Sequence, residues 1–434
     1  MVPRTRALLL TAVALALVAP AAAAPPPEPV CDACGDTFER HAEYHGVDVT
    51  VDRSTATVTV AENGTATWVV RNDLAPSPAV DRLRSNATLL TEATRTALRN
   101  ADFVAANVSA DGVLTMTFRR PDFAERGVGG TLRSGEFTRS FGYRNLDGLG
   151  ADRLVVVAPE GTRVAASVPG STVSDDGVRM TLTDFDRGGF VTFVPESATL
   201  GFLLSWLSIA AVVGPVVVQN ALLGVALPAA VVAVLVVGAG RLLPELDGVL
   251  GAIRARPGRS LLLAGVAGVG LSFAGRVLSV FGTGLPVLFG VSVTAVGLGA
   301  VLVGTGPVRW TYGRALAVAV LGAAVAAVAV AAGSVLFYGR VPWFGLGPRL
   351  ALLTAVFAFL PAGFALRRGQ RRLGVATAAA GVVLALGATT PLVDTYQVFG
   401  LGFRVVLALG DALWLAALGV PLLVVGAALA GSGT

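Results

Sequence analysis

The pattern of hydrophobic and polar positions divides the chain near residue 198. Residues 47–197 alternate between apolar and polar side chains in short runs, whereas the chain from Leu200 onward is almost continuously apolar. Alternation with a period of two is typical of half-buried strands, and apolar runs of about 20 residues are long enough to cross a bilayer. The pattern therefore predicts a β-rich domain followed by a helical membrane domain.

Short alternating runs with turn residues between them predict eight or so strands in residues 47–197. Asn63-Gly64 is one of the dipeptides that favour a tight hairpin turn between two such runs. One helix, at about residues 87–99, interrupts the strands. Regularly spaced short strands favour an all-β, sandwich-like domain. The predicted strands are 47–52, 56–61, 66–71, 104–109, 113–119, 154–158, 178–185 and 190–194.

The apolar half of the chain, residues 220–434, predicts an all-α bundle with seven transmembrane spans. A further apolar run, residues 198–219, precedes them. We expect this run to form an outer interfacial or re-entrant helix, broken near Gly214-Pro215. Eight complete spans are the alternative. The seven predicted spans are 221–240, 260–281, 283–304, 315–337, 349–366, 373–393 and 405–430.

The distribution of arginine predicts the orientation of the bundle. Ten arginines fall in the three loops 241–259, 305–314 and 367–372, whereas the alternate loops hold few. Loops rich in arginine lie preferentially in the cytoplasm. We therefore expect a multi-pass protein of the cell membrane, with the lipid bilayer around its bundle. Its C-terminus is cytoplasmic and its β-rich domain is extracytoplasmic.

The start of the chain supports export of the β-rich domain. Residues 1–24 have the features of a secretory signal peptide, with a basic start, an apolar core and a small-x-small cleavage site at Ala21 and Ala23. Three N-x-S/T sequons fall in the same half of the chain, which makes their asparagines candidates for glycosylation. These asparagines are Asn63, Asn86 and Asn107.

Composition excludes an ordinary soluble enzyme. Of the 434 residues, 54% are hydrophobic and 14% are charged, compared with about 25% charged residues in soluble proteins. Residues 31–197 have a net charge of −6 and residues 198–434 one of +10, so the overall value of +5 describes neither half. This distribution does not indicate a nucleic-acid partner. The chain also lacks the P-loop, H-E-x-x-H and G-x-S-x-G motifs, and we expect no enzymatic activity.

Both cysteines and both histidines of the chain lie within the linker predicted at residues 25–46. Cys31-Asp-Ala-Cys34-Gly resembles a zinc knuckle, in which two thiolates face one metal ion. A disulfide between Cys31 and Cys34 is the second interpretation, because an oxidising exterior favours it. A redox-active C-x-x-C motif is the third.

The residues after this motif favour a short helix that ends before Gly46. Asp36 and Glu39 have the spacing of a capping box at its start. His41 and His45 would then lie one turn apart on the same face, a separation suited to shared metal ligation. Zinc bound by Cys31, Cys34, His41 and His45 is therefore a candidate cofactor.

A few ionisable residues of the bundle form a candidate polar site in the outer leaflet. Asp411 lies about seven residues into the last predicted span, and Arg276 is near the outer end of another. Arg404 precedes Asp411 by seven residues, and Asp394 lies in the outer loop beside them. The site binds a substrate, an ion or a proton in one interpretation. In the other, Asp411 forms a structural ion pair with Arg276 or Arg404.

Three sequence features together resemble haloarchaeal exported polytopic membrane proteins with an N-terminal β ectodomain. They are the C-D-A-C-G motif, the Asn63-Gly64 hairpin followed by Trp68, and the segment Gly148-Leu-Gly-Ala-Asp-Arg-Leu. The resemblance implies a fold and a location but no activity.

The pattern as a whole favours an integral cell-surface protein. Its ectodomain would bind a ligand or an envelope partner, or a signalling protein, and the bundle would anchor the ectodomain or relay the binding event. The alternative is a transporter, or a transport-accessory subunit, that uses the outer-leaflet Arg/Asp site.

Overall fold

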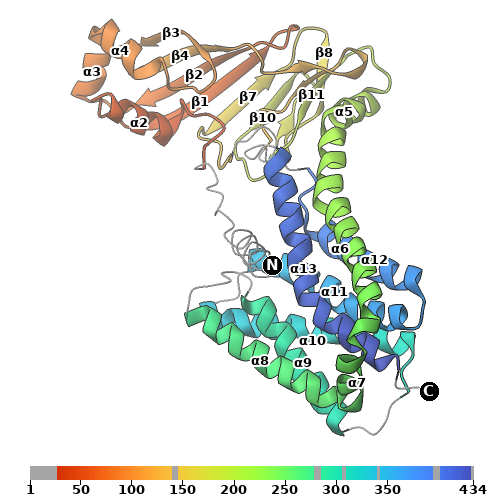
Figure 1. The fold of residues 1–434 in the computed structure, drawn as a ribbon. Coiled ribbons are helices and arrows are strands. Elements are labelled where there is room, and N and C mark those ends of the chain that lie inside the picture. The colour runs from red at the N-terminus through yellow and green to blue at the C-terminus, as the bar shows by residue number, and fades with distance from the viewer. Residues whose placement is uncertain are drawn as a thin grey trace, which may run out of the picture. The chain divides into compact units, whose positions relative to one another are not determined.

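A computed structural model of the chain describes residues 27–138, 145–277, 285–304, 309–339, 343–393 and 401–431. These residues form two compact units, and the division between them falls at Val217–Val218. We call the first the β unit and the second the helical unit (Figure 1). The predicted signal peptide and Asp394 lie outside the described residues.

The β unit is built on a seven-stranded mixed sheet. The order of its strands is β3-β4-β2-β1-β7-β10-β9, with β1 and β7 parallel and the other neighbours antiparallel. The hairpin between β1 and β2 turns at Asn63-Gly64, as predicted, and Gly64 has a φ of +86°. The strands are β1 (Val51–Val60), β2 (Ala66–Leu74), β3 (Asp102–Val108), β4 (Val113–Arg120), β7 (Arg153–Val157), β9 (Thr172–Val173) and β10 (Arg179–Leu182).

A second sheet has four strands in the order β5-β6-β11-β8. Only β11 was predicted; β5 and β6 are two and three residues long, too short to show period-2 alternation, and β8 was missed as well. The sandwich stays a prediction, since what is established is two sheets, of seven and four strands. The strands are β5 (Glu125–Arg126), β6 (Leu132–Ser134), β8 (Thr162–Ala166) and β11 (Val191–Pro195).

Three helices of the β unit correct the expectation of an all-β domain. α2 (Gly35–Tyr44) and α4 (Ala87–Thr94) correspond to predicted helices, although α4 ends five residues early. The third helix, α3 (Pro78–Ser85), was not predicted; it has proline at its first position and buries Val80 and Leu83. Proline there fits a helix start.

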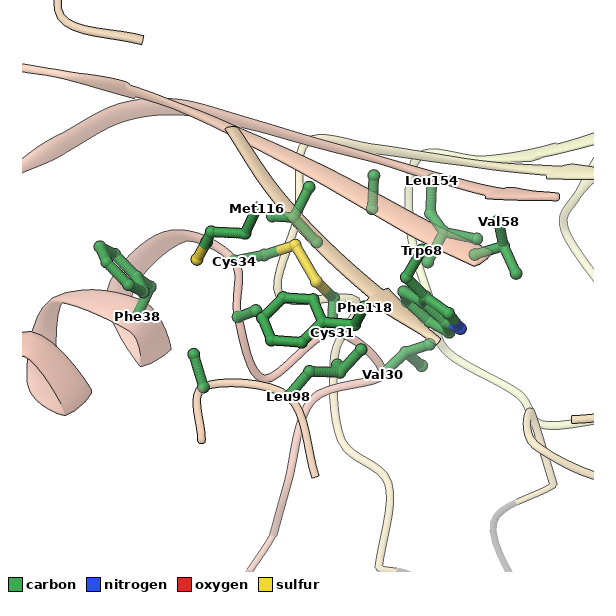
Figure 2. Packing of buried hydrophobic residues seen from close by; sticks show 14 of the residues in the cluster. Val30, Cys31, Cys34, Phe38, Val58, Trp68, Leu98, Met116, Phe118 and Leu154 are labelled. Carbon is green, nitrogen blue, oxygen red and sulfur yellow. A yellow bond between two sulfur atoms is a disulfide. The ribbon is translucent and has the colours of Figure 1, made fainter. Parts of the chain in front are cut away.

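The core of the β unit lies on one face of the large sheet. Alternate residues of the central strands are buried there, including Val58, Trp68 and Phe118. The loop that carries both cysteines packs against them, and Figure 2 shows the disulfide beside Met116 and Phe118. The odd-numbered residues of β1, β2 and β4 therefore form the opposite face, which is polar.

The helical unit consists of long apolar helices. Six of the described helices are long and apolar enough to cross a membrane, and the apolar segment 351–367 of α11 is shorter. Six spans therefore establish a multi-pass protein, and the seventh stays a prediction. The helices are α6 (Leu227–Leu242), α7 (Asp247–Ala255), α8 (Pro257–Val277), α9 (Leu285–Gly304), α10 (Tyr312–Tyr338), α11 (Trp343–Arg367), α12 (Arg371–Thr389) and α13 (Leu401–Leu429).

The run 198–219 does not break where we expected. Helix α5 (Gly201–Ala221) continues through Pro215, and helical structure extends without a loop from Gly201 to Leu246. A membrane helix tolerates a proline because neighbouring groups satisfy the freed carbonyl. The irregularity occurs instead at a π-helical turn, Leu222–Ala226.

Two polar contacts place the arginine-rich loops at one end of the bundle. Arg367 forms an ion pair with Asp247 at 2.8 Å, which joins the 367–372 loop to α7. The Tyr312 hydroxyl lies 2.7 Å from Thr377 Oγ1, which joins the start of α10 to the start of α12. The common side predicted for the three loops is thus consistent with the structure, although neither contact identifies the cytoplasmic side.

Candidate functional sites

The two cysteines form a disulfide in the structure, as the second interpretation of the motif predicted. Cys31 and Cys34 are fully buried in the core of the β unit. The Asn72 amide donates to the Ala33 carbonyl at 3.0 Å and accepts from Ser54 Oγ at 2.5 Å, so the loop is also fixed to β1 and β2. A buried disulfide with these partners is a structural clamp.

Residues 148–150, which are distant in sequence, support the loop that carries the disulfide. Val30 and Cys31 donate backbone hydrogen bonds to the carbonyls of Gly148 and Leu149. Gly150 has a φ of +78°, and a Cβ there would lie 2.5 Å from the Cys31 carbonyl oxygen. Only glycine fits such an approach without displacement. Two of the motifs that carry the resemblance to haloarchaeal exported proteins therefore pack against each other.

The capping box expected at α2 does not form. The helix begins at Gly35, and the N-cap residue Cys34 forms no side-chain capping hydrogen bond. Glu39 instead accepts a hydrogen bond from the Val51 amide at 2.6 Å. This contact fixes α2 to the start of β1. The expectation was wrong because the disulfide loop, which is a tertiary constraint, sets where the helix begins.

The two histidines contact each other and Thr96. The rings of His41 and His45 are 5.0 Å apart between centroids, and His41 Nε2 lies 3.3 Å from Thr96 Oγ1. Partial burial, and then the nearby His45, lower the pKa of His41. Among the described residues, no group of three or more His, Cys, Asp or Glu side chains could hold a metal ion. A zinc site stays a prediction that needs reduced cysteines.

The three sequon asparagines are all exposed in the β unit. Asn63 Oδ1 accepts from the Thr65 amide, and Asn86 Oδ1 accepts from the Leu89 amide as the N-cap of α4. Asn107 lies on the edge strand β3. Each contact uses the amide oxygen, which leaves the nitrogen available for a glycan.

The open face of the large sheet is a surface that the sequence analysis missed. We define it by the residues of β1, β2, β3, β4, β7 and β10 that point away from the core. Thr55, Thr57 and Thr59 of β1 lie in its centre. The signal was present in the sequence, because threonine and arginine occupy most of the odd positions of β1, β2, β4, β7 and β10 taken together.

Cross-strand pairing orders the open face into rows. One row runs from Arg119 of β4 through Thr67 of β2 to Thr59 of β1. A second row, separated from the first by one other row, runs from Thr115 through Arg71 and Thr55 to Arg153 of β7. Directly opposite side chains in such rows are about 5 Å apart. The open face is therefore a regular array in which hydroxyl and guanidinium groups predominate, with valines between them.

The charge of the open face is opposite to that of its unit. Five exposed arginines point from it, and none of them forms an ion pair with a described residue. Two acids lie on the same face, Asp73 directly opposite Arg53 and Asp102 directly opposite Arg119. The face is thus net positive, whereas residues 31–197 together are net negative. The five are Arg53, Arg71, Arg119, Arg153 and Arg179.

Helix α5 is rooted in the small sheet through buried polar groups. Arg133 of β6 is buried, donates to the Ser208 carbonyl at 2.6 Å and pairs with Glu125 at 2.8 Å. Thr192 of β11 lies 2.7 Å from Ser205 by their hydroxyl oxygens. Burying an arginine is costly unless its donors are satisfied, so these contacts define one docked position for the helix start.

The polar site predicted in the bundle is not assembled as an Asp/Arg pair. Arg276 donates to the Phe337 carbonyl at 3.3 Å, and Arg404 donates to Asn220 Oδ1. Asp411 is exposed on α13 and forms no ion pair with a described residue. The structural ion pair was therefore a wrong expectation, because an amide satisfies Arg404.

Asn220 is the polar centre of this part of the bundle. It is buried, and its amide nitrogen donates to the carbonyls of Pro391 and Leu392 at 3.3 and 2.8 Å. It thereby joins the end of α5, the segment after α12 and the start of α13. The π-helical turn Leu222–Ala226 follows it directly. A polar residue within an apolar run was the available signal.

Comparison with protein-family models, with curated proteins and with solved structures gives no match. The resemblance to haloarchaeal exported proteins stays a prediction.

Proposed function

We propose that this protein is an integral cell-surface protein whose β unit binds an anionic polysaccharide of the cell envelope through the open face. The observation that carries the proposal is the array of five arginines and regularly spaced threonines on a net negative unit. Guanidinium groups bind carboxylate and sulfate groups by paired hydrogen bonds. Threonine hydroxyls add donors and acceptors between them.

An extended polymer fits the open face better than a folded protein does. Protein interfaces take most of their energy from buried aromatic or aliphatic anchors, and the rows of the open face hold valine as their largest apolar side chain. A neutral sugar would need aromatic rings to stack on, and none projects from these rows. Repeated charges along a polymer match repeated guanidinium groups on a flat surface.

The helical connection supports a role in relay as well as anchoring. The start of α5 is fixed to the small sheet by Arg133, and helical structure continues from Gly201 to Leu246 without a loop. A helix transmits displacement along its axis more directly than a flexible linker does. Binding at the β unit would therefore bias the first helix of the bundle.

Binding of the full-length protein to a defined polyanion tests the proposal. We expect the detergent-purified chain to bind immobilised dextran sulfate and not dextran, with affinity that falls as salt is raised. The triple variant Arg71→Gln, Arg119→Gln, Arg153→Gln should lose at least about tenfold in affinity, because each lost ion pair with sulfate removes a charge-assisted hydrogen bond.

A matched control variant has the same net charge as the triple variant of the open face. Arg82→Gln, Arg95→Gln and Arg187→Gln remove three exposed arginines of the β unit that lie off the open face. The control variant should bind like the wild type. Equal losses in the two triple variants would mean that net charge, and not the open face, governs binding. Tighter binding to an acidic protein than to dextran sulfate would replace the polysaccharide as the partner.

A second candidate function, transport, is favoured by the polar groups of the bundle. Arg404 and buried Asn220 lie beside a π-helical turn, a feature that often marks functional sites in helices. Unpaired Asp411 on α13 has the chemistry of a proton relay. Proton flux into proteoliposomes, followed with an internal pH dye, should fall in Asp411→Asn, and unchanged flux in a folded variant would remove this candidate.

A further inference from the structure

The helical unit contains an apolar cavity that neither proposed function uses. It is partly open to the surface of the unit, has a volume of about 720 Å³ and lies between α10, α11 and α12. Its walls are mostly alanine, leucine, valine and phenylalanine, among them Ala324 of α10 and Ala380 of α12. Pockets that hold small ligands typically measure 300–1,000 Å³. The cavity is therefore large enough for an apolar chain.

One end of the cavity is polar. The hydroxyls of Tyr312 and Thr377, which line it there, lie 2.7 Å apart across α10 and α12. Tyr312 is at the first residue of α10, and Thr377 is in the second turn of α12. The hydroxyl pair thus marks the end of the cavity that is next to the arginine-rich loops.

Four exposed arginines lie near this polar end along the chain. Arg309 and Arg314 are three and two residues from Tyr312, and Arg371 and Arg372 are six and five residues from Thr377. At 1.5 Å per residue, Arg314, Arg371 and Arg372 lie within about 9 Å of Tyr312 or Thr377 along their helices, and Arg309, just before α10, accepts a hydrogen bond from Arg314 at its carbonyl. None of the four forms an ion pair with a described residue. The entrance is therefore strongly positive.

We propose that this cavity binds an anionic phospholipid, with one acyl or isoprenoid chain between α10 and α12 and the phosphate group at the arginine cluster. Apolar walls, hydroxyl groups and then guanidinium groups follow in the order in which a lipid presents its chain, its glycerol oxygens and its phosphate. Basic pockets between membrane helices bind lipid headgroups through this combination of charge and position. A free phosphate would leave the apolar cavity unused.

Lipid binding to the purified full-length chain tests this assignment. Thermal unfolding and native mass spectrometry in dodecyl maltoside would be measured with dioleoyl phosphatidylglycerol, with dioleoyl phosphatidylcholine and with inorganic phosphate. We expect phosphatidylglycerol to remain bound and to raise Tm. Phosphatidylcholine should bind at least about tenfold more weakly, because its choline offsets the phosphate charge near the arginines. Phosphate alone should have no effect.

Two variants separate the chain from the headgroup. Ala324→Phe with Ala380→Phe fills the cavity and leaves the arginines in place, whereas Arg314→Gln with Arg371→Gln and Arg372→Gln removes charge and leaves the cavity open. Each should reduce phosphatidylglycerol binding by about tenfold or more. Replacing the same three arginines with lysine should restore most of the binding. This conservative rescue also shows whether loss of binding reflects loss of folding.

Matched controls define the outcomes that would overturn the proposal. Ala317→Phe adds a ring on α10 outside the cavity, and Arg241→Gln with Arg256→Gln and Arg259→Gln removes three exposed arginines from the segment α6–α8. Both controls should bind phosphatidylglycerol like the wild type. Equal binding of the two lipids, or equal losses in the cavity and control variants, would overturn it. The proposal would also be overturned if the chain formed a dimer and the cavity-filling substitutions dissociated it, because a second copy of the chain would then occupy the cavity.

Discussion

The β unit encloses most of its large apolar side chains, whereas the helical unit also presents many of them on its surface. The core of the β unit is aromatic, with Trp68, Phe118 and Phe123 almost fully inaccessible. The helical unit exposes large apolar residues, such as Leu263 and Val328 at 73% exposure each. In water, burying apolar surface is the main source of stability, whereas lipid is as apolar as leucine and gives no such drive. Each unit is therefore matched to its own solvent.

The contacts between elements differ in the same way. In the helical unit, glycine allows backbones to approach closely, and a Cβ on Gly426 of α13 would lie 2.0 Å from the Leu360 carbonyl oxygen of α11. In the β unit, a disulfide and buried hydrogen bonds join loops to strands. Removing side-chain volume should therefore destabilise the β unit most, and adding side-chain volume should destabilise the helical unit most.

The largest effect is expected for deletion of an aromatic ring from the β unit. Phe118→Ala should lower the free energy of unfolding of this unit by about 3–5 kcal/mol, because Phe118 of β4 is fully buried and its removal leaves a cavity in the core. Hydrogen exchange of β1, β2 and β4 amides in the full-length chain measures it. Val104→Ala, at a side chain of 55% exposure, is the control. Equal protection in both variants would contradict the aromatic core.

The next effect is expected for loss of the disulfide. Replacing Cys31 and Cys34 by alanine should cost the β unit about 2–4 kcal/mol, the usual contribution of a native disulfide. The same exchange experiment measures it, with no change expected in α8 or α9. Thiol counting and metal analysis of the wild type distinguish the interpretations of the motif. We expect no free thiol, whereas one bound zinc with two titratable thiols would instead establish the metal site.

Local pattern was enough to predict most strands of the large sheet and most of the membrane helices. Period-2 alternation identified β2 and β4, and long apolar runs identified α8, α9 and α10, but β1 is one strand where two, 47–52 and 56–61, were predicted. These features depend on the solvent that each face meets, which the sequence records directly. The start of α2 could not be predicted in this way, because a disulfide fixes it.

The candidate sites were predicted less well because they depend on distant residues. Cys31 and Cys34 were identified, and one of the three interpretations, a disulfide, is present. In one interpretation Asp411 was expected to pair with Arg276 or Arg404, but Arg404 contacts Asn220 across the bundle instead. The open face needed the register of strands far apart in sequence, which no local pattern supplies.

A smaller effect is expected for added bulk in the helical unit. Gly426→Ala should destabilise the contact between α11 and α13 by about 1–3 kcal/mol, because a Cβ there has no space. Gly410→Ala, on the same helix, meets nothing within 4 Å and should be neutral or slightly stabilising. Thermal unfolding of the two variants in the same nanodiscs measures the difference. Similar Tm values would show that α11 and α13 tolerate separation.

The smallest effect is expected from the titration of His41. Because its pKa is lower in the folded chain than the ordinary value of 6.5, the unfolded state binds this proton more readily. The contribution of His41 to stability is therefore fully present above pH 6.5 and decreases as pH falls through the folded pKa. His41→Gln should reduce the loss of β-unit stability between pH 7.5 and 5, measured by hydrogen exchange corrected for the intrinsic pH dependence.

His45→Gln distinguishes the two causes of this pKa shift. Burial is the larger cause and the nearby His45 the smaller, so removing the second imidazole should raise the pKa of His41 only slightly. Nuclear magnetic resonance titration of the remaining histidine ring measures this pKa directly. A return of the His41 pKa to 6.5 in His45→Gln would show that repulsion between the two rings, and not the packing of α2 on the β unit, controls the titration.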